Sequence, residues 1–197
     1  ASNAPSEAQT TEAREKRARE LAAKDAAEAV EVEKQYHAAA QQCTDAFNRA
    51  APDGVSHYLG IKGVNAHGVR FETHGDAVTV LVPLSDNTGK IWNVQRITND
   101  GAKLFAKGAR VSGLYHLIGE YTGTGWVLVA EGYATAATLH ELTGYPVTVG
   151  FNATNLKPVC LALRERFPTS SILVCADNDK ATEERTGKNS GVVAAQN

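Results

Sequence analysis

Short apolar runs alternate with helix-length stretches in the second half of the chain. The runs at residues 126–130, 146–151 and 171–176 are rich in branched side chains and have the length of fully buried parallel strands. The stretch at 133–142 is rich in alanine and leucine, and the stretch at 155–167 has one apolar face. The order strand, helix, strand, helix, strand predicts a right-handed parallel α/β unit.

The first half of the chain has a different pattern. Apolar runs at 77–83 and 91–96 flank a turn at 85–89, which is typical of a β-hairpin. Upstream, the composition is helical and nothing breaks it before Pro52. We therefore divide the chain into residues 1–10, a remnant of tag removal or a disordered segment; 11–52, a helical segment; 53–120, a small β-rich subdomain; and 121–197, the α/β domain, which we expect to be C-terminally truncated.

The helical segment changes character along its length. Up to Lys34 its apolar surface is mostly alanine, so we expect that part to be solvated. From Tyr36 on, apolar residues recur on one face and predict a stripe that docks on the core: Tyr36, Ala40, Cys43 and Phe47. Two interpretations stay open, a simple solvated arm or a connector from an upstream DNA-binding module.

Length, charge and cysteine content narrow the function classes. With 197 residues, 43% of them hydrophobic, the chain can bury one core plus an appendage. We expect no membrane partner, because no apolar run approaches the roughly 18 residues of a span and no signal peptide is visible. Cys43, Cys160 and Cys175 are widely spaced, which predicts neither zinc nor a disulfide and indicates a cytoplasmic location. A net charge of −2 does not by itself indicate nucleic-acid binding, although it can hide a local basic patch.

Three carboxylates directly follow predicted strands. Glu131 ends the first run, and Asp177 and Asp179 follow the third. If the second and third strands flank the first, these acids meet at a topological switch point, where open α/β sheets bind ligands. Because Mg²⁺ prefers such oxygen ligands, the pattern predicts a magnesium site and phosphoryl chemistry. Helix capping and turn chemistry would also explain each motif taken alone.

The segment that carries these acids resembles the Toprim domain, which primases, topoisomerases and some nucleases share. The resemblance rests on the Glu-Gly pair and helix at 131–141 and on Ala-Asp-Asn-Asp at 176–179. The similarity is closer to the primases of conjugative plasmids and phages, the TraC-like group, through four upstream segments: 57–64, 67–70, 103–110 and 113–119. The chain departs from many Toprim domains after Asp179, where residues 180–186 precede Gly187.

The resemblance implies a fold and a set of roles. The fold is a Toprim-type, Rossmann-like parallel sheet with flanking helices, preceded by the β-rich subdomain and the N-terminal helix. Glu131 would be the catalytic acid, acting as general base for an attacking 3′-hydroxyl or completing the metal shell. Asp177 and Asp179 would be ligands of Mg²⁺, for which Mn²⁺ could substitute.

Basic residues gather between the hairpin and the α/β unit. They are Arg96, Lys103, Lys107 and Arg110, and the single acid among them is Asp100. A charge run of this kind is commonly a solvated face. The resemblance instead favours contacts with the template backbone or the incoming triphosphate, more firmly for Lys103 and Lys107 than for the two arginines.

The histidines and large aromatic residues are expected to be structural. The six histidines show no metal-ligand spacing, and we predict structural positions for His57 and His116. Phe71, Trp92, Phe105 and Trp126 are predicted core residues, with base stacking as the alternative for one of them.

These observations lead to one main hypothesis and two alternatives. The main hypothesis is the catalytic core of a plasmid- or phage-type DNA primase, a magnesium-dependent enzyme that joins ribonucleoside triphosphates on single-stranded DNA. A replicative helicase, or a fused helicase domain, would be a further partner. The alternatives are a Toprim nuclease and a non-catalytic nucleic-acid-binding domain of a replication protein.

Overall fold

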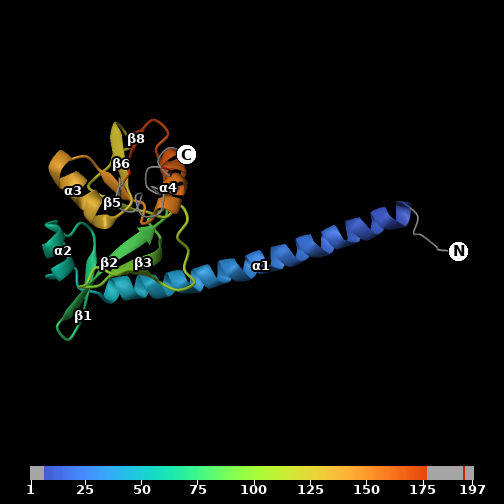
Figure 1. Ribbon diagram of the computed structural model, residues 1–197, viewed down its shortest axis with the longest axis horizontal. Helices are drawn as coiled ribbons and strands as arrows, with labels where there is room; N and C mark the ends of the chain where they lie inside the picture. The colour runs from blue at the N-terminus through green and yellow to red at the C-terminus, as the bar shows by residue number, and fades with distance from the viewer. Residues whose placement is uncertain (1–6, 177–192, 194–197) are drawn as a thin grey trace.

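The computed structural model describes residues 7–176 and residue 193, with side chains from residue 14 onward. One long helix and two four-stranded sheets dominate this part of the chain (Figure 1). Asp177 and Asp179, two of the predicted magnesium ligands, lie outside the described residues.

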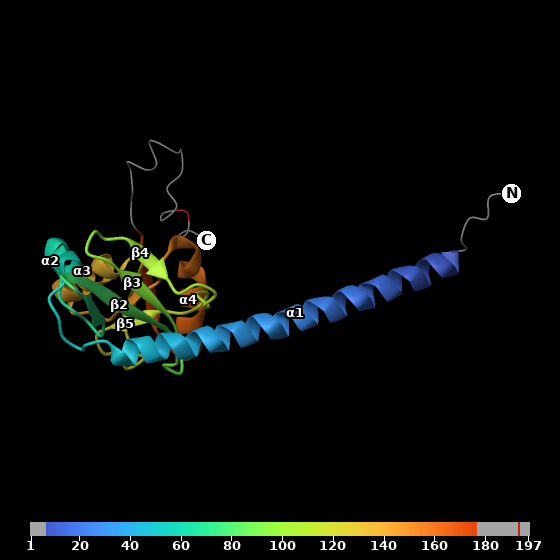
Figure 2. The same cartoon turned by 90° about the horizontal axis from the view of Figure 1, so that it is seen from below.

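Helix α1 (Glu7–Arg49) begins four residues before the predicted start and has two distinct parts. Residues 14–35 are exposed, and Figures 1 and 2 show this part projecting from the body. The C-terminal part packs on the first sheet, where Ala40 and Cys43 are only 2% and 3% exposed. Tyr36 and Phe47 are partly buried against the same core, so the predicted docking stripe is confirmed.

The first sheet is an antiparallel meander. Its strands are β1 (Arg70–His74), β2 (Ala77–Ser85), β3 (Ile91–Ile97) and β4 (Lys103–Phe105), in the order β1-β2-β3-β4. The predicted hairpin is the β2–β3 pair. A short helix, α2 (His57–Lys62), precedes the sheet; the Ser56 side chain caps its start and Gly63 ends it at φ 64°, a left-handed conformation that suits glycine.

The second sheet contains the predicted α/β unit. Its elements are β5 (His116–Ile118), β6 (Trp126–Ala130), α3 (Tyr133–Thr143), β7 (Val147–Val149), α4 (Ala153–Arg166) and β8 (Ser171–Cys175). The strand order is β5-β7-β6-β8, in which β7 and β8 both pair parallel with β6 and β5 pairs antiparallel with β7. The predicted arrangement, with the second and third strands flanking the first, is confirmed.

Alternate residues of β6 bury themselves against different helices. Leu128 and Ala130 share a core with α3, whereas Val127 and Val129 pack with α4. The α3 core also contains Val80, Val82 and Leu84 of β2, so this core extends from α3 to the first sheet. A backbone pair between Ser85 and Tyr115 joins the sheets where the chain passes from one to the other. The predicted mixed α/β fold with a β-rich subdomain and an N-terminal helix is confirmed.

Two further expectations have clear outcomes. Trp126 is not a core residue, because it opens β6 at the rim of the sheet and its side chain is 49% exposed. Phe71 and Trp92 are buried as expected, at 3% and 6% exposure. None of the helices within residues 7–176 combines the length and apolarity that crossing a bilayer demands.

Candidate active site

Glu131 lies where the central strand β6 ends and α3 begins. Ala130 before it is fully buried, and Glu131 itself is half-buried. Gly132 is the N-cap of α3 and has no side chain to cap the helix, although its carbonyl oxygen accepts a 3.0 Å hydrogen bond from Ala136 N. The carboxylate therefore stands beside a helix N-terminus whose amide groups carry partial positive charge.

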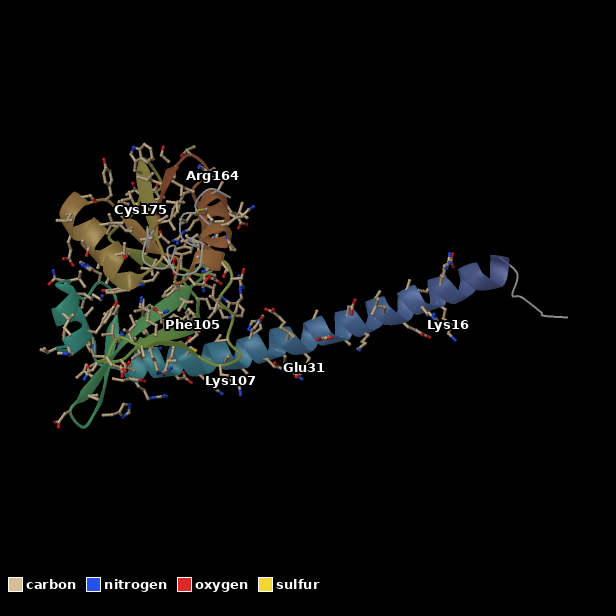
Figure 3. All side chains as sticks on the ribbon, viewed as in Figure 1. Lys16, Glu31, Phe105, Lys107, Arg164 and Cys175 are labelled. Carbon is tan, nitrogen blue, oxygen red and sulfur yellow. The ribbon has the colours of Figure 1, made fainter. Side chains whose placement is uncertain are left out.

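The three parallel strands end at the same edge of the sheet. Ala130 pairs with Val149 of β7 on one side and with Cys175 of β8 on the other, and Figure 3 labels Cys175 at this strand end. This register brings Glu131 level with Ala176, the residue that precedes Asp177 in the chain. Since neighbouring strands lie about 5 Å apart, residues that leave these two strand ends begin close together.

The described part of the chain does not by itself hold a metal-binding set. Within it no three His, Cys, Asp or Glu side chains come together in a group suited to a metal ion. The predicted site therefore depends on Asp177 and Asp179, which lie outside that range. The register of β6 and β8 is compatible with this set, because it places Glu131 and Ala176 at one edge of the sheet.

A polar cavity adjoins the start of α3. It has a volume of about 460 Å³, and its lining comes from α2, the β3–β4 turn, β4 and the first turn of α3. The lining residues are Tyr58, Ile61, Lys62, Asn99, Asp100, Gly101, Lys103, Ala134 and Thr135. Lys103 Nζ lies 3.4 Å from the position that a Cβ on Gly132 would occupy. A predicted basic residue is thus brought next to the turn that carries Glu131.

The cavity carries more positive than negative charge. Neither Lys62 nor Lys103 forms an ion pair within the described residues, and both are exposed. The one acid is Asp100, whose pKa is lowered by hydrogen bonds from the Thr98 hydroxyl and the Ala102 amide. Two uncommitted ammonium groups beside a helix N-terminus form a surface suited to phosphate.

The structure does not bring all four predicted basic residues together. Arg96 faces the α1 side of the first sheet, and its guanidinium bonds to Glu72 at 3.1 Å. Arg110 lies 5.1 Å from the centre of the Trp92 ring and donates to the Ser112 carbonyl. Lys107 is exposed in the loop after β4, where Figure 3 labels it near Phe105. Of the four, Lys103 is the residue that lies beside the Glu131 turn.

The loop after β7 is fixed by one buried asparagine. Asn155 of α4 is 3% exposed and donates to the carbonyl oxygens of Leu114 and Gly150, at 3.0 and 2.8 Å. Its Oδ1 accepts from Gly113 N at 2.8 Å. Phe151, which follows Gly150, has φ 72°, a strained value for a bulky residue. Its ring packs edge-on against the ring of Phe105. These contacts fix the strand end beside Glu131.

A buried polar network ties α3 to the loop after α2. The Tyr133 hydroxyl donates to the Asn65 carbonyl at 3.1 Å and accepts from His67 N at 2.8 Å, and burial raises the pKa of Tyr133 to about 12. The Glu141 carboxylate accepts a hydrogen bond from Asn65 N and forms another with the His67 ring. These two bonds lower the pKa of Glu141. His116 donates to the His67 carbonyl at 2.7 Å, and burial lowers the pKa of His116 to about 4. The predicted structural role of His116 agrees with this geometry.

Several of these residues were not identified from the sequence. Tyr133 lies in the segment 131–141 that resembles the Toprim domain, so its place near the start of a helix could be predicted. Its hydroxyl, however, bonds to His67 N, which is 66 residues away in the chain. Lys62 lies in the segment 57–64 that carries the resemblance, but nothing in the sequence assigned this lysine a role. Phe151 gave none, because a positive φ at phenylalanine depends on the surrounding packing and not on a local preference.

Comparison with known proteins agrees with this geometry. Residues 126–197 match the Toprim domain. Two relatives, both DNA primase TraC from Escherichia coli, are 35% and 33% identical over 90% and 87% of this chain. The matches cover 17% and 12% of those relatives, so the chain spans less than a fifth of their length. The predicted resemblance to TraC-like Toprim primases is confirmed.

Solved structures support the fold at lower identity. The primase fragment of the bacteriophage T7 primase-helicase protein has a TM-score of 0.54 and 21% identity, over 70% of this chain and 60% of that one. A structure of bacteriophage T7 lagging-strand DNA polymerase interacting with primase domains has a TM-score of 0.53 and 19% identity, over 75% and 72%. At this level of identity, the two matches show that the fold is shared.

Proposed function

We propose that this chain, which carries a Toprim domain of the TraC-like primase type, is the catalytic core of a DNA primase. It would join ribonucleotides on a single-stranded DNA template during plasmid or phage replication or conjugation. The observation that carries the proposal is the strand edge where Glu131 is level with Ala176 and Lys103 lies beside Gly132.

The proposed metal ligands are Glu131, Asp177 and Asp179. Their oxygen atoms suit Mg²⁺, with Mn²⁺ as a substitute, and the in-register ends of β6 and β8 support a shared site. Bound there, the ion would neutralise phosphate charge and orient the reacting groups. Zinc is not part of the proposal, because none of Cys43, Cys160 and Cys175 belongs to a group of metal-binding side chains within the described residues.

The protein groups around this edge have separate proposed tasks. Glu131 accepts the proton of the attacking 3′-hydroxyl, a role that its half-buried position beside a helix N-terminus permits. Lys103 and Lys62 bind phosphate oxygens in the adjoining cavity. Lys107, exposed in the loop after β4, and less firmly Arg96 and Arg110, contact the template backbone.

The proposed partners follow from the relatives. Single-stranded DNA and ribonucleoside triphosphates are the substrates of a primase. One structural neighbour is named a primase-helicase protein, which supports a replicative helicase or a fused helicase domain as a partner of this chain. A replication enzyme of this kind would work in the cytoplasm.

The decisive test is the Glu131→Gln substitution, alone and beside Asp177→Ala. Because glutamine keeps the shape of the side chain but cannot accept a proton, we expect primer synthesis to fall by at least about 100-fold while the melting temperature stays unchanged. The assay measures incorporation of labelled ribonucleotides on single-stranded DNA, with the full-length protein as well as this chain. Glu120→Gln, an exposed acid outside the site, is the matched control.

The same experiment separates the alternatives. Full primer synthesis by the Glu131→Gln variant would contradict the proposal. Nicking of single-stranded DNA without primer synthesis, lost in the same variant, would instead identify a Toprim nuclease. DNA binding that is unchanged by Glu131→Gln, with neither activity in the full-length protein, would identify a non-catalytic domain.

A further inference from the structure

The exposed part of α1 continues a second row of buried or partly buried residues, which shares Tyr36 and Cys43 with the docking stripe but has Ala39 and Ala46 in place of Ala40 and Phe47. Positions 36, 39, 43 and 46 face the first sheet, and they alternate in steps of three and four, which is the heptad spacing of a coiled-coil seam. The same steps continue backward without a break into the projecting part. The residues that they select there are Glu15, Ala18, Ala22, Asp25, Ala29 and Val32. Four of these six are apolar, and all six are exposed.

The projecting part also divides into two oppositely charged halves. Residues 14–24 contain five basic residues and two acids, whereas residues 25–33 contain four acids and no basic residue. Leu21 lies beside the seam and is 60% exposed. Within one helix, the ion pairs Lys16–Glu20 and Arg19–Glu15 are long, at 4.0 and 3.8 Å, and highly exposed, so they contribute little.

We propose that this arm is a self-association surface that binds the arm of a second copy of the chain in antiparallel orientation. Antiparallel pairing places the basic half of each arm against the acidic half of the other. With residue 14 opposite residue 33, the four basic residues within 14–19 of one arm lie level with the three acids within 28–33 of the other. Figure 3 shows Lys16 and Glu31 on the part of the helix that stands clear of the body.

The seam itself favours the same orientation. A parallel pair would stack Asp25 on its own copy and like-charged halves on each other. In the antiparallel register Asp25 faces Ala22, and the small side chains at 18, 22 and 29 allow the helices to approach closely. The overlap of residues 14–33 is about 30 Å long, which ends before Tyr36, where each arm enters its own body.

Sedimentation analysis of the whole chain tests the proposal. We expect a monomer–dimer equilibrium between about 10 and 500 µM that weakens in high salt. One variant carries Glu28→Lys, Glu31→Lys and Glu33→Lys, and a second carries Arg14→Glu, Lys16→Glu and Arg19→Glu. Each alone should dimerise about 30-fold more weakly, and an equimolar mixture should recover a 1:1 heterodimer.

A control keeps the charge change but moves it to the body. It carries Asp45→Lys, Glu120→Lys and Glu165→Lys, three exposed positions outside the arm, and should dimerise like the original chain. Circular dichroism checks that helix content is kept in every variant. A chain that stays monomeric at about 500 µM, or variants that dimerise undiminished, would overturn the proposal, as would a mixture that fails to form the heterodimer. Primer synthesis is not needed for any of these readouts.

Discussion

Lys103 shows how one side chain connects the two sheets at the candidate site. It belongs to the edge strand β4 of the first sheet, yet its ammonium group lies beside Gly132 at the start of α3 in the second. With Lys62 it makes the adjoining cavity positive. Binding of a triphosphate in this cavity would therefore depend on a residue from outside the Toprim sheet.

Substitution of this lysine tests that dependence. We expect Lys103→Ala to raise the KM for ribonucleoside triphosphates about tenfold and to leave the melting temperature within about 2 °C, because an exposed ammonium group is removed. Lys103→Arg should restore part of the affinity, since it keeps the charge. Steady-state primer synthesis at varied nucleotide concentration measures both. An equal rise in KM for Lys34→Ala, a distant exposed lysine, would argue against a specific role.

At the scale of elements, α4 fixes the end of β7 through Asn155. Truncation of this side chain leaves Gly113 N and the carbonyl oxygens of Leu114 and Gly150 without their partner. Buried polar groups without partners are costly, so Asn155→Ala should lower the free energy of unfolding by about 2–4 kcal/mol. Urea titration gives the value. Lys157→Ala, an exposed position on the same helix, should change it by no more than about 0.5 kcal/mol.

Elements were predictable where a periodic pattern repeats over several residues. The parallel strands, the docking stripe of α1 and the hairpin all follow from apolar spacing, and the structure confirms them. For the candidate site, the sequence predicted only that Glu131 lies at a strand end, because sheet topology alone places it there. The ion pair of Arg96 with Glu72 depends on which face of the first sheet each residue occupies, and the position of Arg110 over Trp92 depends on the path of the chain after β4. A charge run cannot reveal that.

At the scale of the whole molecule, His116 makes the stability of the contact between the two sheets depend on pH. It lies on β5 of the second sheet, and its ring donates to the His67 carbonyl in the loop before β1. Burial holds its pKa at about 4, below the ordinary value of 6.5. Between these two values the unfolded chain binds the proton more readily than the folded chain does, so stability falls as pH falls.

This coupling has a measurable size. Lowering the pH from about 7 to about 5 should reduce the free energy of unfolding by about 2 kcal/mol through His116 alone. The chosen range stays above the depressed pKa of Glu141, so that carboxyl remains charged. His116→Gln should remove the pH-dependent loss, whereas His74→Gln, an exposed position, should keep it. Urea unfolding at several pH values distinguishes them, and an unchanged slope in His116→Gln would contradict the assignment.

The strand order has a consequence for how the protein is made. β6 lies in the middle of the second sheet, but β8, which pairs with it along all five of its residues, is the last of the four strands in chain order. While the ribosome has yet to release β8, one side of β6 has no strand partner and remains an exposed edge. The edge that carries Glu131 therefore cannot assemble during early synthesis, and it forms only once the distant end of the domain has emerged.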